Sequence, residues 1–153
     1  MKSSIFSFIA AAVLTLFASM SFAGAQGEQY TKRGYAVSGY DTVAYFTVGK
    51  PTKGDKNIST EWNGAKWLFS SEEHKELFLA NPTKYAPAYD GHCAFAAGIG
   101  KKVSAKPTLW KVLDNRLYLN FSKPANERWL ENPESYIKDG DENWKTLSAE
   151  PAA

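Results

Sequence analysis

The side chains best suited to metal chemistry lie close together in this chain of 153 residues. Cys93 is its one cysteine, and His74 and His92 are its two histidines. A thiolate and imidazoles form a mixed donor set that zinc or copper accepts. Metal bonds of about 2.0 to 2.3 Å require donor atoms within roughly 4 Å of one another. We therefore expect any metal site to be centred on Cys93, with His92 or His74 as its nitrogen ligand and Asp41 as a further donor.

Each of these residues also has a structural interpretation. His74 follows two glutamates on a predicted helix, where it can be a solvated surface histidine. A free cysteine is commonly a small buried hydrophobe, whereas a thiol at a helix N-terminus can have a lowered pKa and act as a ligand or redox group. Asp41 can accept backbone donors in the turn after Gly39. The residue types alone leave these alternatives open.

Catalysis has the least support in the sequence. A nucleophilic Cys-His pair needs the imidazole within hydrogen-bond reach of sulfur, which adjacent residues such as His92 and Cys93 rarely achieve. His74 could reach Cys93 only if its helix folded over the Cys93 turn. The chain has no Gly-rich phosphate loop, paired zinc motif or hydrolase elbow. We therefore expect a binding function rather than an enzyme.

A hairpin and a capped helix precede His92 and Cys93. Aromatic and apolar residues flank Asn63-Gly64, a pair that tolerates the positive φ values of a tight turn, so strands are predicted over Ile58–Trp62 and on to Phe69. Ser70 or Ser71 then caps a helix that runs to Ala80, with glutamates near the positive end of its dipole. Pro82 ends this helix, because the residue before a proline is pushed out of the α region.

The second half of the chain repeats this pattern 51 residues later. The matching residues occupy turn, cap, core and helix-stop positions: Asn63 and Asp114, Trp67 and Tyr118, Ser71 and Ser122, Phe78 and Trp129, and Asn81-Pro82 and Asn132-Pro133. A second hairpin over 109–121 and a helix over 124–131 are therefore predicted. At this offset His74 falls on Ala125, and His92-Cys93 falls in a region with no counterpart, since Asn143-Trp144 stands at the offset positions. The candidate ligands thus belong to one copy only.

These elements predict an α+β fold in which small antiparallel hairpins pack with short helices, the duplicated hairpin-helix unit forming one domain. A hydrophobic content of 44% and an aromatic content of 14% suit a single compact core. Two further segments precede and follow the candidate ligands. The stretch up to Phe46 passes through a turn at Gly39 into a β-prone run, and a small helix is expected over 94–97.

The N-terminus is typical of an exported protein. Lys2, an apolar run over 5–20 and small residues near Ala23 form the three parts of a signal peptide, predicted over 1–25. A flexible tail over 26–34, the domain over 35–147 and a C-terminal tail over 148–153 follow. We expect a periplasmic or secreted protein. The apolar run is too short for a membrane span, and a net charge of +2 gives no reason to expect nucleic acid or a membrane surface as partner.

The chain resembles the YHS domain family, and in particular its exported, stand-alone members. The resemblance covers roughly 35–147 and is carried by these stretches: Gly39-Tyr40-Asp41-Thr42-Val43-Ala44-Tyr45-Phe46, Trp62-Asn63-Gly64-Ala65-Lys66-Trp67-Leu68-Phe69-Ser70-Ser71, Asn81-Pro82, Tyr89-Asp90-Gly91-His92-Cys93-Ala94, Leu117-Tyr118-Leu119-Asn120 and Asn143-Trp144.

Metal-associated members of this family typically carry an early Cys-Pro-x-Cys pair and a Cys-x-x-x-Cys pair after the aromatic strand, which imply heavy-metal binding. In this chain Tyr-Asp-Thr-Val-Ala replaces the early pair, and Ser70 and His74 replace the later one. Cys93 belongs to the motif of the stand-alone members. Soft thiolates are what select copper(I) or zinc, so their loss weakens the implied metal function.

Two function classes follow. One is a small exported module that binds a copper or zinc ion through Cys93 and histidine. The other is a module that binds a non-metal ligand or a protein partner and has lost the family's metal ligands. Metal-dependent thermal stabilisation would separate the two.

Overall fold

The structure is a computed structural model that describes residues 27–151. The predicted signal peptide over 1–25 lies outside this range. The elements follow one another as β1 (Thr31–Lys32), β2 (Tyr35–Ala36), the 3-10 turn η1 (Val37–Gly39), α1 (Ala44–Thr47), β3 (Asp55–Trp62), β4 (Ala65–Phe69), α2 (Glu72–Ala80), α3 (Pro82–Tyr85), the 3-10 turn η2 (Ala88–Gly91), α4 (Ala94–Gly98), β5 (Lys106–Leu113), β6 (Arg116–Asn120), α5 (Lys123–Glu131) and α6 (Pro133–Leu147). The prediction of an α+β fold is confirmed.

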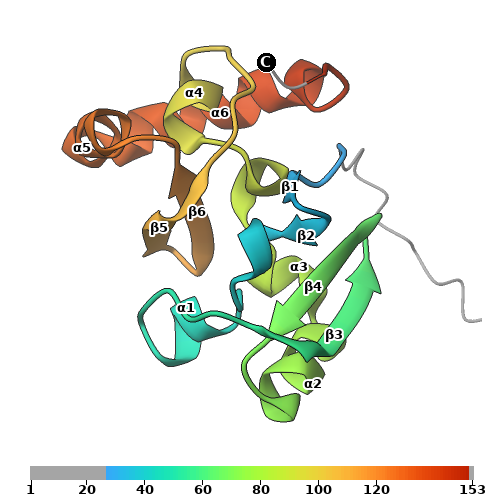
Figure 1. The fold of residues 1–153 in the computed structure, drawn as a ribbon. Coiled ribbons are helices and arrows are strands. Elements are labelled where there is room, and N and C mark those ends of the chain that lie inside the picture. Colours follow the sequence, from blue (N-terminus) through green and yellow to red (C-terminus); the bar gives the residue numbers. More distant parts are fainter. Residues whose placement is uncertain (1–26, 152–153) are drawn as a thin grey trace, which may run out of the picture.

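Two small sheets carry the strands. The first has the order β1-β2-β4-β3, in which β2 pairs with β4 in parallel and the other neighbours are antiparallel. The second is the β5-β6 hairpin. In Figure 1 the β3-β4 hairpin lies beside α2 and α3, whereas β5 and β6 lie beside α4, α5 and α6.

The predicted duplication is present in the fold. Each of β3, β4, α2 and α3 begins 51 residues before β5, β6, α5 and α6, respectively. Both hairpins shift register at the same place, between Asp55 and Ser59 in one and between Lys106 and Trp110 in the other. The same cap types recur, because Ser71 and Ser122 each accept the backbone N–H three residues on. The repeated residue types thus specify repeated local structure.

The duplication also extends upstream, which the sequence did not indicate. Positive φ values of 49°, 55° and 82° at Val37, Ser38 and Gly39 are matched by 55°, 49° and 79° at 89–91. A short helix follows each of these turns. Tyr40-Asp41 and His92-Cys93 are therefore equivalent, and the prediction that His92-Cys93 has no counterpart is wrong. The offset here is 52 residues rather than 51, and the residue types differ. We call 37–85 the first unit and 89–147 the second unit.

The β-prone run up to Phe46 is a second correction. Its end forms α1 instead of a strand, because Asp41 accepts the backbone N–H groups of Val43 and Ala44 and so fixes the turn that leads into this helix. Local capping here outweighs the strand preference of β-branched and aromatic residues.

Both ends of the described chain are packed. β1 pairs with β2, the side chain of Gln29 is buried, and the N–H of Tyr30 donates to the carbonyl of Asp90 at 2.8 Å. At the other end, the ammonium of Lys102 donates to the carbonyl oxygens of Ser148 and Glu150. The folded part therefore begins before Tyr35 and continues past Leu147.

The two units share a core. One cluster of buried residues joins Trp67, Phe69 and Phe78 of the first unit to Leu117 and Leu119 of the second. A second cluster, around Trp129 and Tyr118, lies under α4 and α6. No helix within 27–151 is both long and apolar enough to span a membrane.

Candidate functional site

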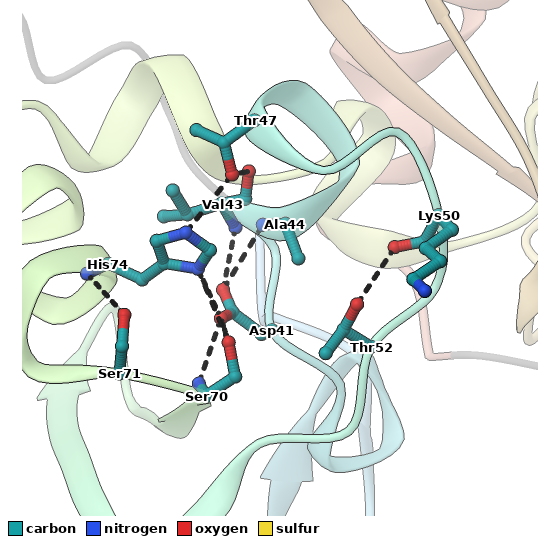
Figure 2. A network of polar contacts seen from close by, with 9 residues as sticks. All are labelled: Asp41, Val43, Ala44, Thr47, Lys50, Thr52, Ser70, Ser71 and His74. Carbon is teal, nitrogen blue, oxygen red and sulfur yellow. Dashed lines mark hydrogen bonds and ion pairs between the residues drawn. The ribbon is translucent and has the colours of Figure 1, made fainter.

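Asp41 forms the centre of a polar cluster in the first unit, which we call the Asp41 cluster and which also contains Thr47, Ser70 and His74. Its side chain is fully buried. Oδ1 accepts the N–H groups of Val43 and Ala44 at 3.0 and 3.3 Å. Oδ2 accepts the N–H and the hydroxyl of Ser70 at 2.8 and 2.6 Å, and Nδ1 of His74 at 2.6 Å. Figure 2 shows these donors converging on the one carboxylate.

The start of α2 places His74 in this cluster. Ser71 accepts the backbone N–H of His74 at 3.1 Å and fixes the first helical turn. Because residue 74 lies in that turn, its ring points back toward the strand end at Ser70, as Figure 2 shows. The side chain is only 13% exposed, so His74 is not a solvated surface histidine.

The far side of the imidazole faces a hydroxyl. A carboxylate can only accept, so Nδ1 of His74 carries a proton, and Nε2 lies 3.1 Å from Oγ1 of Thr47. The order carboxylate, imidazole, hydroxyl is the one used to activate a nucleophile. However, Thr47 Oγ1 also donates to the carbonyl of Val43 at 3.2 Å, within its own helix. The hydroxyl is thus tied to its own helix, and its contact with Nε2 makes the cluster a clamp between α1 and α2.

Cys93 is buried in the second unit, with 1% of its surface exposed. Its sulfur donates to Oδ1 of Asn120 at 3.5 Å and accepts the N–H of Phe121 at 3.3 Å. Desolvation by burial raises the pKa of the thiol, against smaller opposing effects of backbone N–H groups. The alternative of a lowered thiol pKa at a helix N-terminus is therefore wrong, since this side chain is held in the neutral form.

His92 is buried in an aromatic setting. Its Nδ1 lies 3.0 Å from the carbonyl of Tyr89, and its ring centroid is 5.4 Å from the rings of both Tyr30 and Trp144. Desolvation by burial lowers the pKa of this imidazole, and the nearby Lys102 ammonium lowers it further. His92 is thus kept as the neutral ring in the native state.

The structure pairs the four predicted site residues differently from the prediction. Asp41 and His74 meet in the first unit, while the polar contacts of Cys93 are with Asn120 and Phe121 rather than with an imidazole. Asp41 and Cys93 are equivalent, since each accepts the backbone N–H at the end of its hairpin. Within 27–151, no group of three or more His, Cys, Asp or Glu side chains is placed to hold a metal ion.

A cavity of about 490 Å³, which the residue pattern did not predict, opens beside the first unit. We call it the basic cavity, and its lining residues are Lys32, Arg33, Tyr35, Ser38, Gly39, Tyr40, Lys53, Gly54, Lys56 and Leu68. The sequence feature that could have indicated this cavity is a set of basic residues next to turn glycines, both before and after α1.

One comparison with known proteins bears on this arrangement. The family model of the YHS domain matches residues 43–89, which hold α1, the first hairpin, α2 and α3. No curated protein and no solved structure matches the chain. The predicted resemblance to the YHS domain family is confirmed over residues 43–89.

Proposed function

We propose that this protein is an exported, YHS-type module that binds a non-metal ligand and in which the family's metal position has become a structural clamp. The observation that carries the proposal is the Asp41 cluster. Ser70 and His74 replace the later cysteine pair of the metal-associated members, and both donate to the carboxylate of Asp41. The position where ligands would converge is thereby filled by hydrogen bonds between side chains of the chain itself.

The donor set fits copper or zinc poorly. The carboxylate of Asp41 already accepts from five donor groups. Cys93 would have to lose its proton in a buried place that favours the thiol, and thiolate is the form that binds metal. His74 alone offers one imidazole nitrogen, beside hydroxyl groups that are weak ligands for either ion.

The proposed location is the periplasm or the extracellular space, because residues 1–25 have the pattern of a signal peptide. A small molecule or a protein partner remains the proposed class of ligand. The basic cavity of the first unit, about 490 Å³ in volume, falls in the size range of small-molecule sites.

A metal titration tests this proposal. The mature protein is analysed for bound metals after purification and is then titrated with zinc and, under reducing conditions, with copper(I). We expect less than about 0.1 equivalent of metal and an unchanged Tm, because a ligand that binds only the native state would raise it. Cys93→Ala and His74→Ala variants are titrated in parallel.

One equivalent of zinc or copper that raises the Tm of the wild type, and that is lost in Cys93→Ala or His74→Ala, would overturn the proposal and support the metal-binding alternative. His92→Phe is titrated as well, because it removes the other predicted nitrogen ligand, and the exposed-site variant Asp139→Asn serves as the control.

A further inference from the structure

We propose that the basic cavity of the first unit binds a small organic anion, with its carboxylate or phosphate at the basic rim and its apolar body against the tyrosine rings. This inference rests on the proposed non-metal function and names the ligand class. The cavity lies between the β1-β2 turn and the segment that leads into β3.

The charge around the cavity is of one sign. Lys32 and Arg33 come from the β1-β2 turn, and Lys53 and Lys56 come from the other wall. No acidic residue lines the cavity, and within 27–151 none of these four cations forms an ion pair. The carboxylate of Asp55, between the two lysines, accepts the N–H of Asn57 at 2.8 Å instead. Four cations of one sign around a concave surface attract an anion.

The floor of the cavity is rigid and partly apolar. The N–H of Gly54 donates to the carbonyl of Gly39 at 2.9 Å, and Tyr40 pairs with Lys53 in a β-bridge. A Cβ atom on Gly54 would lie 2.5 Å from Cβ of Leu68, so glycine permits this close approach. Leu68 and the half-buried rings of Tyr35 and Tyr40 line the same space. An aromatic or aliphatic body can lie against them.

The second unit shows what fills the equivalent place. Asp90, Gly91 and His92 correspond to Ser38, Gly39 and Tyr40, and they are covered by the N-terminal segment 27–30. The N–H of Tyr30 donates to the carbonyl of Asp90, and the rings of Tyr30 and His92 are in contact. A Cβ atom on Gly91 would lie 2.4 Å from the side-chain nitrogen of Gln29. In the first unit the same turn lines an open cavity.

Lys53 and Lys56 are specific to the first unit, whereas Lys106 of the second unit stands where Asp55 stands in the first. Ser104 and Pro107 stand in the second unit where Lys53 and Lys56 stand in the first, and Ala105 stands where Gly54 stands. A duplicated surface that is covered by the N-terminal segment in one copy, but open and lined by four cations in the other, favours an external anion as the occupant of the open copy.

Binding of two aromatic acids and a neutral analogue tests the inference. Metal-free mature protein is titrated with benzoate, phenyl phosphate and benzamide, and binding is followed by calorimetry and by amide NMR shifts. Comparison of benzoate with phenyl phosphate shows whether the site prefers a carboxylate or a phosphate. We expect at least one acid to shift the amides of Gly39 and Gly54, and benzamide to leave them unchanged.

The double variant Lys53→Met/Lys56→Met should weaken that acid about tenfold or more, because it removes two of the four cations that line the cavity. The control variant Lys111→Met/Lys138→Met removes the same charge from exposed positions outside the cavity. It should change the affinity less than twofold.

The inference is overturned if neither acid shifts the cavity amides, if benzamide binds as well as the acids, or if both double variants behave alike. If neither benzoate nor phenyl phosphate binds, only the anion site is rejected. The proposed non-metal function is judged separately, by the metal titration. Stoichiometric metal uptake would instead remove the proposed function while leaving the cavity to be judged by these titrations.

Discussion

Asp41 and Cys93 show how one position in a duplicated unit can be filled by a carboxylate or by a thiol. Each precedes a short helix, and each accepts the backbone N–H at the end of the neighbouring hairpin strand, from Ser70 or from Phe121. The carboxylate accepts further donors, and His74 reaches it from α2. The second unit has Ala125 in place of His74 and relies on the amide of Asn120, which accepts the N–H of Phe95 at 3.0 Å.

The Asp41→Asn variant should lose stability because one amide oxygen cannot replace two carboxylate oxygens that together accept from five groups. We expect a loss of about 2 to 4 kcal/mol in the free energy of unfolding, typical of breaking a buried charged network. Urea unfolding of Asp41→Asn, with the exposed-site variant Asp139→Asn as control, measures it. A loss below about 0.5 kcal/mol would contradict the clamp.

Cys93 should react slowly with a thiol reagent in the native protein. Burial both shields the sulfur and raises its pKa, so little thiolate is available at pH 8. We expect the rate with Ellman's reagent to rise about 100-fold or more in 6 M guanidinium chloride. Equal rates in the native and unfolded protein would show that the thiol is accessible and reactive.

At the scale of elements, the sequence predicted both hairpins and the first helix after each, but it missed the second helix of each unit. The turn pairs at 63–64 and 114–115 and the caps Ser71 and Ser122 act within a few residues, so their local signals predict both hairpins and both first helices. α6 was not predicted, because Asn132-Pro133 looks like a helix stop. In the structure Asn132 is also the N-cap of the next helix, with proline in its first turn.

The packing of α6 on α4 can be tested at Gly140. A Cβ atom there would lie 2.7 Å from the hydroxyl oxygen of Tyr89 and 3.4 Å from the backbone nitrogen of Gly98. Gly140→Ala would gain about 1 kcal/mol in helix propensity, yet we expect a net loss of about 1 to 3 kcal/mol because the clash forces α6 away from Tyr89. Thermal unfolding measures this change.

The neighbouring variant Asp139→Ala changes an exposed side chain of the same helix and should leave the Tm within about 2 °C of the wild type. If Gly140→Ala were instead more stable than the wild type, the close contact between α6 and Tyr89 would be wrong.

At the scale of the whole molecule, the sites depend on contacts between distant segments, which is why residue types predicted them only in part. The predicted metal set assumed that Cys93 and the histidines converge, since they lie close together in the sequence. Duplication instead sends His74 to the first unit and Cys93 to the second. The basic cavity likewise forms only when the β1-β2 turn meets the start of β3, and neither segment signals this alone.

The termini of the described chain also close over the second unit, and this gives the molecule a dependence on pH through His92. Its ring contacts Tyr30 on one side and Trp144 on the other, and Lys102, which lies over Trp144, donates to the carbonyls of Ser148 and Glu150. Protonation of His92 would put a buried positive charge beside the ammonium of Lys102, whereas the backbone of Tyr89 and the carboxylate of Glu28 favour the charged ring.

The pKa of His92 is lowered in the native protein, first by desolvation, so below the ordinary value of 6.5 the unfolded chain binds a proton that the native ring resists. The contribution of His92 to stability is therefore complete above about pH 6.5 and is lost as the pH falls below it, with a slope of at most about 1.4 kcal/mol per pH unit. Desolvation raises the pKa of Asp90, so the contribution of Asp90 to stability has the opposite dependence on pH. Asp90 is present in both the wild type and His92→Phe, so the comparison of these two proteins isolates His92.

We expect the free energy of unfolding of the wild type, minus that of His92→Phe, to be flat from pH 7 to 8 and to fall between pH 6.5 and 5. Urea unfolding across this range measures the difference, and a difference that stays constant or rises toward pH 5 would show that His92 is not held neutral between the two ends of the described chain.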